Sequence, residues 1–385
     1  MNLFFERVIS RRDFLKRCSV LALGGTILSK VTKFGYAQQA NLGLVRPQRA
    51  LYYEKLQNER IKCLLCPRGC IVPEGGRGLC RVRENRKGEY YTLAHSNPCA
   101  VHIDPIEKKP LFHFLPGTTA LSLATAGCNF TCKNCQNWDI SQAKPDDTIN
   151  FELSPEQVVN LALEYNTPTI AYTYTEPSIF YEYMLETAKI ARKSGIRNMY
   201  HSNGSLNPEP AEQISQYLDG ANIDLKGFTQ KFYTEISQGF LKTVLSTLKI
   251  LRKNRVHLEI TNLVVPPFND DLKTIKAMCE WIRDSLGVDV PLHFTRFYPQ
   301  YKLKNLTPTL VRTLEKAREI AQKVGLEYVY IGNVPGHPAE NTYCPKDGKL
   351  LVRRTGFSIL ENNIEDGRCK FCGEPIPGIW PTPHT

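Results

Sequence analysis

The stretch GCNFTCKNCQNWD, at Gly127–Asp139, places three cysteines at the spacing C-x3-C-x2-C. A short apolar run, Leu121–Thr125, precedes it and predicts a strand that ends in a cysteine loop. Such a loop can present the thiolates of Cys128, Cys132 and Cys135 from one short piece of backbone. Thiolates are the usual protein ligands of iron–sulfur clusters, and a [4Fe–4S] cube held by three of them keeps one iron open. An open iron can bind a small molecule.

The alternative for these three cysteines is a zinc site. Structural zinc takes four closed ligands, often from two C-x2-4-C pairs. No fourth cysteine lies close to the triplet in the sequence, so the spacing favours the cluster.

The length and composition are those of a globular protein with one large domain and appendages. The chain has 385 residues, of which 42% are hydrophobic and 23% charged. Its net charge is +11, and residues 1–37, with seven Lys or Arg and two Asp or Glu, carry +5 of it. The remaining +6 is spread over the rest of the chain and gives no reason to expect a nucleic-acid partner. No apolar run reaches the roughly twenty residues that a bilayer span needs.

Between Ala120 and Gly332, strand-like runs alternate with helical patterns. This alternation predicts a parallel sheet, and six or seven such units predict a partial or complete barrel. The chemistry of such barrels lies at the C-terminal ends of the strands, where the cysteine loop follows the first strand. The strand-like runs are Leu121–Thr125, Thr169–Thr173, Asn198–Ser202, Ala221–Leu225, Leu258–Val265, Leu292–Phe297 and Tyr328–Ile331.

The helical pattern with the clearest start opens at Ser154, a suitable N-cap, with Pro155 in the first helical position and Gln157 in the third. The other helical patterns cover roughly Ser178–Lys193, Pro208–Leu218, Gln230–Lys253, Asp271–Leu286 and Thr307–Val324.

Ten of the thirteen cysteines fall into three groups. Tight C-x2-C spacing beside Pro and Gly favours metal sites over a disulfide framework in a chain of this length. The group before the triplet leaves three interpretations open: a zinc site, an auxiliary iron–sulfur cluster or a pair of disulfides. Its members are Cys63, Cys66, Cys70 and Cys80.

A last group near the C-terminus, Cys344, Cys369 and Cys372, resembles a zinc ribbon. Asp347 stands where a further cysteine is expected. Because Asp can ligate zinc but weakens the site, both a retained and a lost zinc site stay open.

Five longer motifs occur in an order that resembles the radical SAM member of the AmmeMemoRadiSam system, a group similar to the pyruvate formate-lyase activating enzymes. The resemblance runs from about Cys63 to Trp380. The motifs are Cys63–Cys70, Asp104–Leu111, Gly127–Ser141, Tyr172–Pro177 and Tyr330–His337.

The resemblance implies an α/β fold of the partial TIM-barrel type, (β/α)6, with a [4Fe–4S] cluster on the cysteine triplet. S-adenosylmethionine (SAM) would bind the fourth iron, and one electron from a low-potential donor would cleave it to a 5′-deoxyadenosyl radical. That radical would abstract hydrogen from an unknown protein or small-molecule substrate, a glycyl residue of a partner protein among the candidates. The expected parts are a signal segment (1–37), a Cys-rich N-terminal extension (38–117), the radical SAM barrel (118–338) and a zinc-ribbon-like tail (339–385).

A second hypothesis is a non-catalytic iron–sulfur protein that carries electrons or senses redox state. Such a carrier would want a fourth cysteine near the triplet, and the sequence shows none. The missing ligand therefore favours the enzyme.

The resemblance also carries over a set of SAM-site residues at strand ends. Glu176 would accept from the amino group of SAM, but Tyr174 and Thr175 stand where activating enzymes have two glycines, so we expect a different backbone approach there. The segments around Asn203 and Asp224 resemble the Thr-Asn-Gly and Asp-Leu-Lys of activating enzymes, which favours a role at SAM; a turn and a local charge pair are the structural alternatives. The candidates are Glu176, Asn203, Asp224 and Lys226.

Several further side chains are weaker candidates. His293, Arg296 and His337, assigned to the ends of later strands, are weaker candidates for the substrate side of the site. We expect His113 to be a packed structural histidine, and Phe130 and Trp138 to form apolar walls beside the cluster.

The N-terminal segment resembles a twin-arginine export signal. Ser10–Lys16 read SRRDFLK, a moderate apolar run covers Cys18–Leu28, and cleavage would fall after Ala37. The signal predicts export to the periplasm. A cytoplasmic location is the alternative, because SAM and low-potential electrons are found there.

Overall fold

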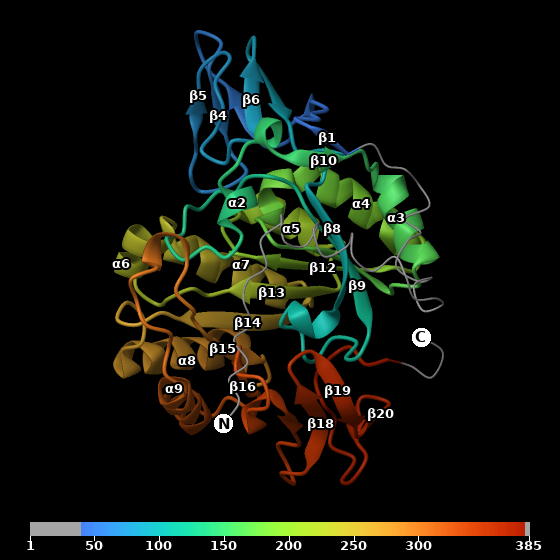
Figure 1. Ribbon diagram of the computed structural model, residues 1–385, viewed down its shortest axis with the longest axis vertical. Helices are drawn as coiled ribbons and strands as arrows, with labels where there is room; N and C mark the ends of the chain where they lie inside the picture. Colours follow the sequence, from blue (N-terminus) through green and yellow to red (C-terminus); the bar gives the residue numbers. More distant parts are fainter. Residues whose placement is uncertain (1–39, 382–385) are drawn as a thin grey trace, which may run out of the picture. The chain divides into compact units, whose positions relative to one another are not determined.

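A sheet of eight strands organises the protein (Figure 1). The computed structural model describes residues 40–381, which belong to one compact unit, so the predicted signal segment lies outside the described residues. Seven of the strands are parallel and confirm the seven predicted runs. They are β9 (Thr119–Ala124), β11 (Thr169–Tyr172), β12 (Arg197–Ser202), β13 (Gly220–Asp224), β14 (His257–Val264), β15 (Leu292–Arg296) and β16 (Val329–Gly332).

The eighth strand, β8 (Ala100–Pro105), pairs antiparallel with β9 and forms one edge of the sheet; β16 forms the other. No sequence pattern predicted a strand in this segment. His102 and Ile103 are both exposed, so no alternation of apolar and polar residues marks the strand.

Helices connect the successive parallel strands (Figure 1). The first begins with the predicted capping box, in which the Gln157 backbone N–H donates to Ser154 Oγ (3.3 Å) and the Ser154 N–H donates to Gln157 Oε1 (2.7 Å). The long helices are α3 (Pro155–Glu164), α4 (Tyr181–Lys193), α5 (Pro208–Ser215), α7 (Leu241–Lys253), α8 (Leu272–Leu286) and α9 (Val311–Val324). The short helical pieces are α2 (Trp138–Ser141), α6 (Gln230–Phe232), the π-helix η4 (Tyr233–Ser237), and the 3-10 helices η1 (Ile106–Lys108), η2 (Pro145–Asp147), η3 (Pro177–Phe180), η5 (Tyr301–Leu303) and η6 (Pro338–Glu340).

One predicted helix, Gln230–Lys253, is broken into α6, η4 and α7. Gln238 takes a left-handed conformation (φ 54°), and Gly239 leaves room for a neighbouring ring. A Cβ on Gly239 would lie 2.2 Å from the ring of Phe130 in the cysteine loop. The break therefore makes the space into which the cysteine loop packs.

The N-terminal extension consists of short strands and packs on helix α4 through a buried ion pair. Arg83 Nη2 donates to both carboxylate oxygens of Glu182 in α4 at 2.6 Å, and both side chains are buried. The short strands before and after β8 are β1 (Ala40–Leu42), β2 (Gln48–Arg49), β3 (Tyr53–Lys55), β4 (Ile61–Cys63), β5 (Ile71–Val72), β6 (Arg83–Arg86), β7 (Glu89–Thr92) and β10 (Ile149–Phe151).

The C-terminal tail forms a small antiparallel sheet that docks on the segment after β8. Arg354 is buried, stacks over the Phe112 ring at 4.2 Å and donates to the Phe112 carbonyl at 2.9 Å. The tail strands are β17 (Thr342–Tyr343), β18 (Leu350–Thr355), β19 (Ser358–Asn362), β20 (Ile364–Glu365) and β21 (Arg368–Cys369).

None of the helices in the described part of the chain is long and apolar enough to cross a bilayer.

A buried carboxylate on β14 ties the segment after β8 to the sheet. Glu259 Oε1 accepts from the backbone N–H groups of Phe112 (2.8 Å) and His113 (2.7 Å) and lies 3.0 Å from His257 Nε2, while Oε2 lies 2.6 Å from His293 Nε2. Burial alone would raise the pKa of Glu259, but the hydrogen bonds and charges of the two histidines hold it well below its usual value.

We predict that Glu259→Gln destabilises the fold by about 3–5 kcal/mol at neutral pH, because it removes a buried charge and leaves its partners incompletely paired. Since the folded pKa of Glu259 is depressed, its contribution is present above the unfolded pKa and is lost as the pH falls through the folded value. Chemical denaturation of both proteins at several pH values measures this. A stability gap that widens in acid would contradict the assignment.

Candidate functional site

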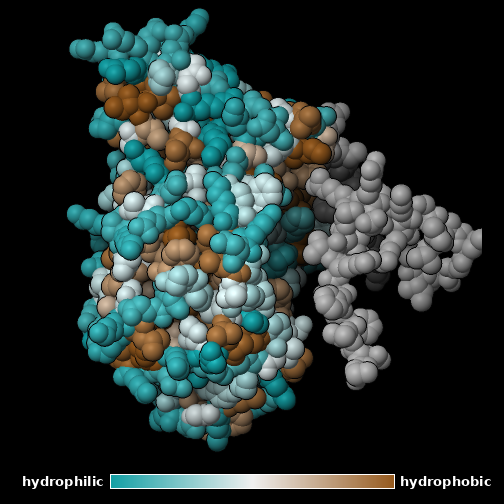
Figure 2. Space-filling view, turned by 60° about the vertical axis from the view of Figure 1, so that its left-hand side comes forward, coloured by the Kyte–Doolittle hydropathy of each residue, from teal (hydrophilic) through white to brown (hydrophobic). Residues whose placement is uncertain are grey.

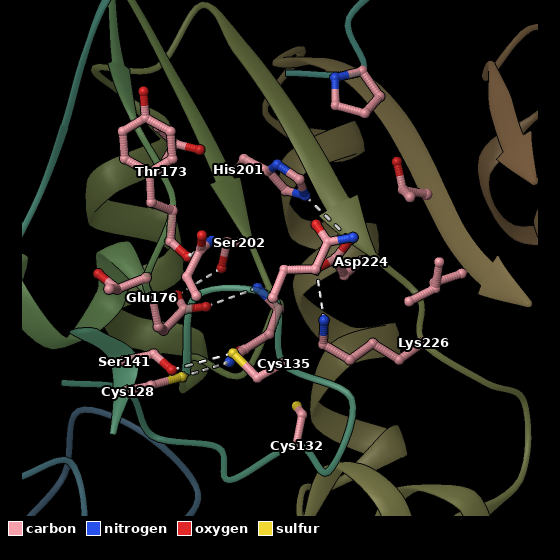
Figure 3. A pocket seen from close by; sticks show the side chains of 18 of the residues that line it. Cys128, Cys132, Cys135, Ser141, Thr173, Glu176, His201, Ser202, Asp224 and Lys226 are labelled. Atoms are coloured by element: carbon pink, nitrogen blue, oxygen red, sulfur yellow. Dashed lines mark hydrogen bonds and ion pairs between the residues drawn. The ribbon is translucent and has the colours of Figure 1, made fainter. Parts of the chain in front are cut away.

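A cavity of about 450 Å³ lies at the C-terminal edge of the parallel strands (Figure 3). The predicted strand-end residues Glu176, Asn203, Asp224 and Lys226 all line it, and so do the three cysteines of the triplet. The structure thus brings these seven candidates together at the edge where barrel chemistry takes place.

The three cysteine sulfurs gather at one end of the cavity, with polar hydrogens near two of them (Figure 3). The Phe130 backbone N–H lies 3.3 Å from Cys128 Sγ, and Ser141 Oγ lies 3.2 Å from Cys135 Sγ. Burial raises the pKa of Cys132 to about 11, although the Lys226 ammonium lowers it, and burial raises the pKa of Cys128 well above its usual value. Buried thiols of this kind become thiolates when a metal supplies positive charge, so the donor set fits an iron–sulfur cluster.

Glu176 lies on one side of these sulfurs, where its carboxylate joins the ends of β11 and β12. Its Oε1 accepts from the Ser178 N–H (3.0 Å), Ser178 Oγ (2.8 Å) and Ser202 Oγ (2.8 Å), and Oε2 accepts from the Asn203 N–H (2.7 Å). Burial raises the pKa of Glu176, and these hydrogen bonds partly offset the rise. Oε1 is fully used within the protein, whereas Oε2 can accept a further hydrogen bond.

Asn203 connects the end of β12 to the cysteine loop. Its Nδ2 donates to Asn129 Oδ1 at 2.8 Å and lies 3.9 Å from Cys128 Sγ. Asn129 Nδ2 in turn donates to the carbonyl of Ser205 at 2.9 Å. This network holds the cysteine loop beside the end of β12. Asn203 therefore positions the loop, whether or not it also contacts a ligand.

Asp224, Lys226 and His201 form a polar cluster on the other side of the sulfurs (Figure 3). Asp224 Oδ2 accepts from Lys226 Nζ at 2.6 Å, and Oδ1 lies 3.1 Å from His201 Nε2. Desolvation would raise the pKa of Asp224, but Lys226 and His201 hold it far below its usual value. Asp224 in turn raises the pKa of Lys226 against desolvation, so both groups are charged.

A second polar group, around Asp104, contributes Lys108, Lys109 and Tyr174 to the cavity wall and was not among the predicted site residues. Asp104 Oδ2 accepts from Lys109 Nζ (2.5 Å) and from the Tyr174 hydroxyl, and Oδ1 accepts from Lys108 Nζ (2.8 Å). Lys109 also lies 4.5 Å from the centre of the Tyr174 ring, and burial lowers its pKa to about 8. The motif Asp104–Leu111 contained these residues, but only the fold shows that they meet Tyr174.

Tyr174 takes the left-handed conformation, with φ at 62°. This conformation costs a residue with a side chain roughly 1–2 kcal/mol and is natural for glycine. The backbone therefore adopts a glycine-like conformation at the position where the resemblance places the first of two glycines, even though a tyrosine occupies it. The bonds of its ring and hydroxyl to Lys109 and Asp104 hold it there.

The expectation for His293, Arg296 and His337 is wrong, because none of the three lines the cavity. His293 lies near the start of β15 rather than at its end and is paired with Glu259. Arg296 donates to the Thr309 carbonyl at 2.8 Å, and His337 caps η6. A position near a strand end did not determine where each side chain points.

The other aromatic and histidine candidates divide between packing and the cavity. His113 is buried between the Tyr330 hydroxyl (2.6 Å) and the Pro377 carbonyl (2.7 Å), which confirms a structural role. Phe130 lines the cavity as expected. Trp138 is instead about half exposed and stacks on Tyr301 at 5.2 Å.

The fold and the site define a class: an α/β protein with three clustered cysteines beside an open ligand cavity, as iron–sulfur enzymes that bind a substrate or cosubstrate at the cluster have. The profile of the radical SAM superfamily matches residues 122–282. The chain belongs to this superfamily.

Two proteins of known sequence are similar to this chain. An uncharacterized protein of Methanocaldococcus jannaschii is 47% identical over 331 residues, which are 86% of this chain and 98% of the relative. The pyruvate formate-lyase 1-activating enzyme of Escherichia coli is 22% identical over 218 residues, which are 53% of this chain and 89% of the enzyme.

The tail brings a separate set of metal-ligand types together. The ligand atoms of its members lie within 4.8 Å of one another, and Cys344 Sγ lies 3.6 Å from Cys372 Sγ. A zinc tetrahedron with bonds of about 2.3 Å has sulfurs about 3.8 Å apart, so this set fits zinc, with Asp347 in place of a cysteine. The set is Cys344, Asp347, Cys369 and Cys372.

We predict that Gly127→Ala impairs loading of the cluster. Gly127 has φ 97°, and a Cβ there would lie 2.5 Å from the Cys80 carbonyl oxygen, so the cysteine loop must shift. Gly195→Ala is the matched control, since Gly195 has φ 75° with no atom within 4 Å of the added Cβ. Iron content after anaerobic reconstitution should fall only in the first variant. Equal iron content in both would show that the contact with Cys80 is unimportant.

We predict that the tail binds one zinc ion that supports stability and not turnover. Cys372→Ala removes one of its four ligands, so the variant should lose the zinc and unfold at a lower temperature. A chelator should lower the unfolding temperature of the wild type and leave that of the variant unchanged. Loss of SAM cleavage in a variant of unchanged stability would contradict this division of roles.

Proposed function

We propose that Cys128, Cys132 and Cys135 hold a [4Fe–4S] cluster, that SAM binds at its open iron, and that the target of the enzyme is a C–H bond of a partner protein, a glycyl residue among the candidates. The main support for this proposal is the arrangement of three buried or partly buried cysteines at one end of a cavity of about 450 Å³. No fourth cysteine of the described chain lines that cavity, as a closed electron-carrier cluster would require. When bound, the cluster and SAM supply one-electron cleavage of the sulfonium to a 5′-deoxyadenosyl radical.

The protein supplies charge and position. Lys226 carries a positive charge close enough to Cys132 to lower its pKa, so it offsets part of the negative charge of three thiolates. Glu176 Oε2 has a free acceptor position for the amino group of SAM. Asp224, held ionised by Lys226 and His201, is a second acceptor on the opposite side of the sulfurs.

The walls also exclude water. Phe130 is buried beside the sulfurs, and Leu263 of β14 contributes an apolar side chain to the lining. Six helix-connected steps from β9 to β16 support a partial barrel of the (β/α)6 type as the frame for this cavity. A reactive radical needs such a frame, because stray hydrogen donors would quench it.

Two features support a protein as the substrate. The relatives with printed activities include an activating enzyme for pyruvate formate-lyase, which is itself a protein. In addition, Phe357, about half exposed in the turn between β18 and β19, lines the cavity together with Lys108. Aromatic and cationic groups at the rim suit a peptide segment that enters from outside.

We predict that Cys132→Ala reduces formation of 5′-deoxyadenosine from SAM and dithionite to background, because the cluster loses one of three ligands. Cys279→Ala is the matched control, since Cys279 is a buried free thiol in α8 and does not line the cavity. The assay is anaerobic incubation of reconstituted protein followed by chromatography. A Cys132→Ala protein that cleaves SAM at the wild-type rate would refute the proposed site.

A further inference from the structure

The four cysteines of the N-terminal extension surround a small second cavity. They come from the end of β4, the loop after it and the two segments that lead into β5 and β6, and the structure pairs none of the described cysteines in a disulfide. Gly78 lies beside this space: a Cβ there would lie 3.8 Å from both Cys70 Sγ and Cys80 Sγ and 3.2 Å from the Tyr90 hydroxyl. The cysteines that line this cavity are Cys63, Cys66, Cys70 and Cys80.

Three buried polar groups that line the same cavity have no hydrogen-bond partner. They are Arg68 Nη2, Arg83 Nε and the Tyr90 hydroxyl. Arg83 and Tyr90 are each only 1% exposed, so water does not satisfy them from outside. Buried donors without an acceptor are costly, and their convergence on four thiols indicates that an anionic, acceptor-rich group belongs between them.

The spread of the sulfurs separates zinc from an iron–sulfur cluster. Thiolates around one zinc ion lie about 3.8 Å apart, as bonds of about 2.3 Å require. In the described part of the chain only the tail group has its ligand atoms within 4.8 Å of one another, so no three sulfurs of the extension reach this spacing. Thiolates on the corners of a four-iron cube are farther apart, and its inorganic sulfides add acceptors.

We propose that Cys63, Cys66, Cys70 and Cys80 hold a second [4Fe–4S] cluster, whose sulfurs accept from Arg68, Arg83 and Tyr90. Four protein thiolates close all four irons of this cluster, so it can exchange electrons but cannot bind SAM. The metal site stands independently of the proposed function. Its role as an electron relay rests on that function.

The position of the second cavity suits a relay to the cysteine triplet. Asn129, next to Cys128, lines it, and Arg68 Nε donates to the Asn129 carbonyl at 3.0 Å. Ile71 and Leu79 flank two of the cysteines and are 58% and 42% exposed. Figure 2 shows apolar surface near the upper end, where Figure 1 places the extension. A partner can therefore dock within reach of the second cluster.

The relay needs one external protein that donates a single electron. A reduced one-electron iron–sulfur or flavin protein gives one electron to the second cluster and is itself oxidised. The second cluster then passes that electron to the metal group at the triplet and returns to its oxidised state. No bond is made or broken at the extension in this exchange.

The first experiment counts the clusters in the full-length chain after anaerobic reconstitution. Two cubes give about eight irons per chain, and Cys128→Ser/Cys132→Ser/Cys135→Ser should keep about half of them. The remaining cluster should have an electron paramagnetic resonance signal that added SAM leaves unchanged. Cys66→Ser/Cys70→Ser should keep the other half, with a signal that SAM does change. A triplet variant that binds no iron, binds a second zinc ion in addition to that of the tail, or carries disulfides at the extension would overturn the proposal.

A milder variant tests the site where the double cysteine variant fails to fold. Tyr90→Phe removes one unpartnered hydroxyl, and because hydrogen bonds to cluster sulfurs raise the reduction potential, that of the SAM-insensitive cluster should fall. The control is Tyr328→Phe, which removes a buried unpartnered hydroxyl that does not line this cavity. Unchanged potentials in Tyr90→Phe would overturn the proposed contact.

The relay has its own test. With dithionite, a small reductant that can reach the triplet directly, Cys66→Ser/Cys70→Ser should still cleave SAM. With a reduced ferredoxin or flavodoxin as the donor, the same variant should lose this activity. Equal retention with both donors would overturn the relay and leave the second cluster standing. Failure of the wild type to cleave SAM with either donor would refute the proposed function and leave the iron count intact.

Discussion

The cysteine loop is held by chain segments that are far apart in the sequence, and the rest of the site depends on this support. Gly127 packs beneath the Cys80 carbonyl of the extension, Asn129 bonds to Asn203 after β12, and Phe130 fits against Gly239 before α7. Three thiols on one short loop would otherwise be free to collapse onto a smaller metal. Support from three sides keeps their spacing fixed, which is what a cluster with one open iron requires.

The extension consequently packs directly against the elements that hold the cysteine loop. It closes on α4 through the buried pair of Arg83 and Glu182, and it contacts the loop at Gly127. The same arginine lines the second cavity. One side chain thus connects the packing of the extension with the place where we infer the second cluster.

Much of the fold followed from local patterns, whereas the site followed only in part. The seven parallel strands and the capping box at Ser154 are encoded in apolar runs and short spacings, which tertiary contacts did not override. Strand β8 and the break at Gly239 escaped prediction because they depend on distant partners: β9 for the strand and the Phe130 ring for the break. Position at a strand end selected Glu176 and Asp224, which both line the cavity. It misplaced Arg296, which ends β15 but donates to the Thr309 carbonyl, because a strand-end position does not determine the direction of a side chain.

Tyr174 has an evolutionary consequence. The backbone at this position has a positive φ, 62°. A residue other than glycine keeps this conformation only when other contacts compensate for the strain. Asp104 and Lys109 supply these contacts and so anchor the tyrosine. Positions 104, 109 and 174 should therefore covary among homologues: those that lack the acidic anchor would be expected to have glycine at the strained position.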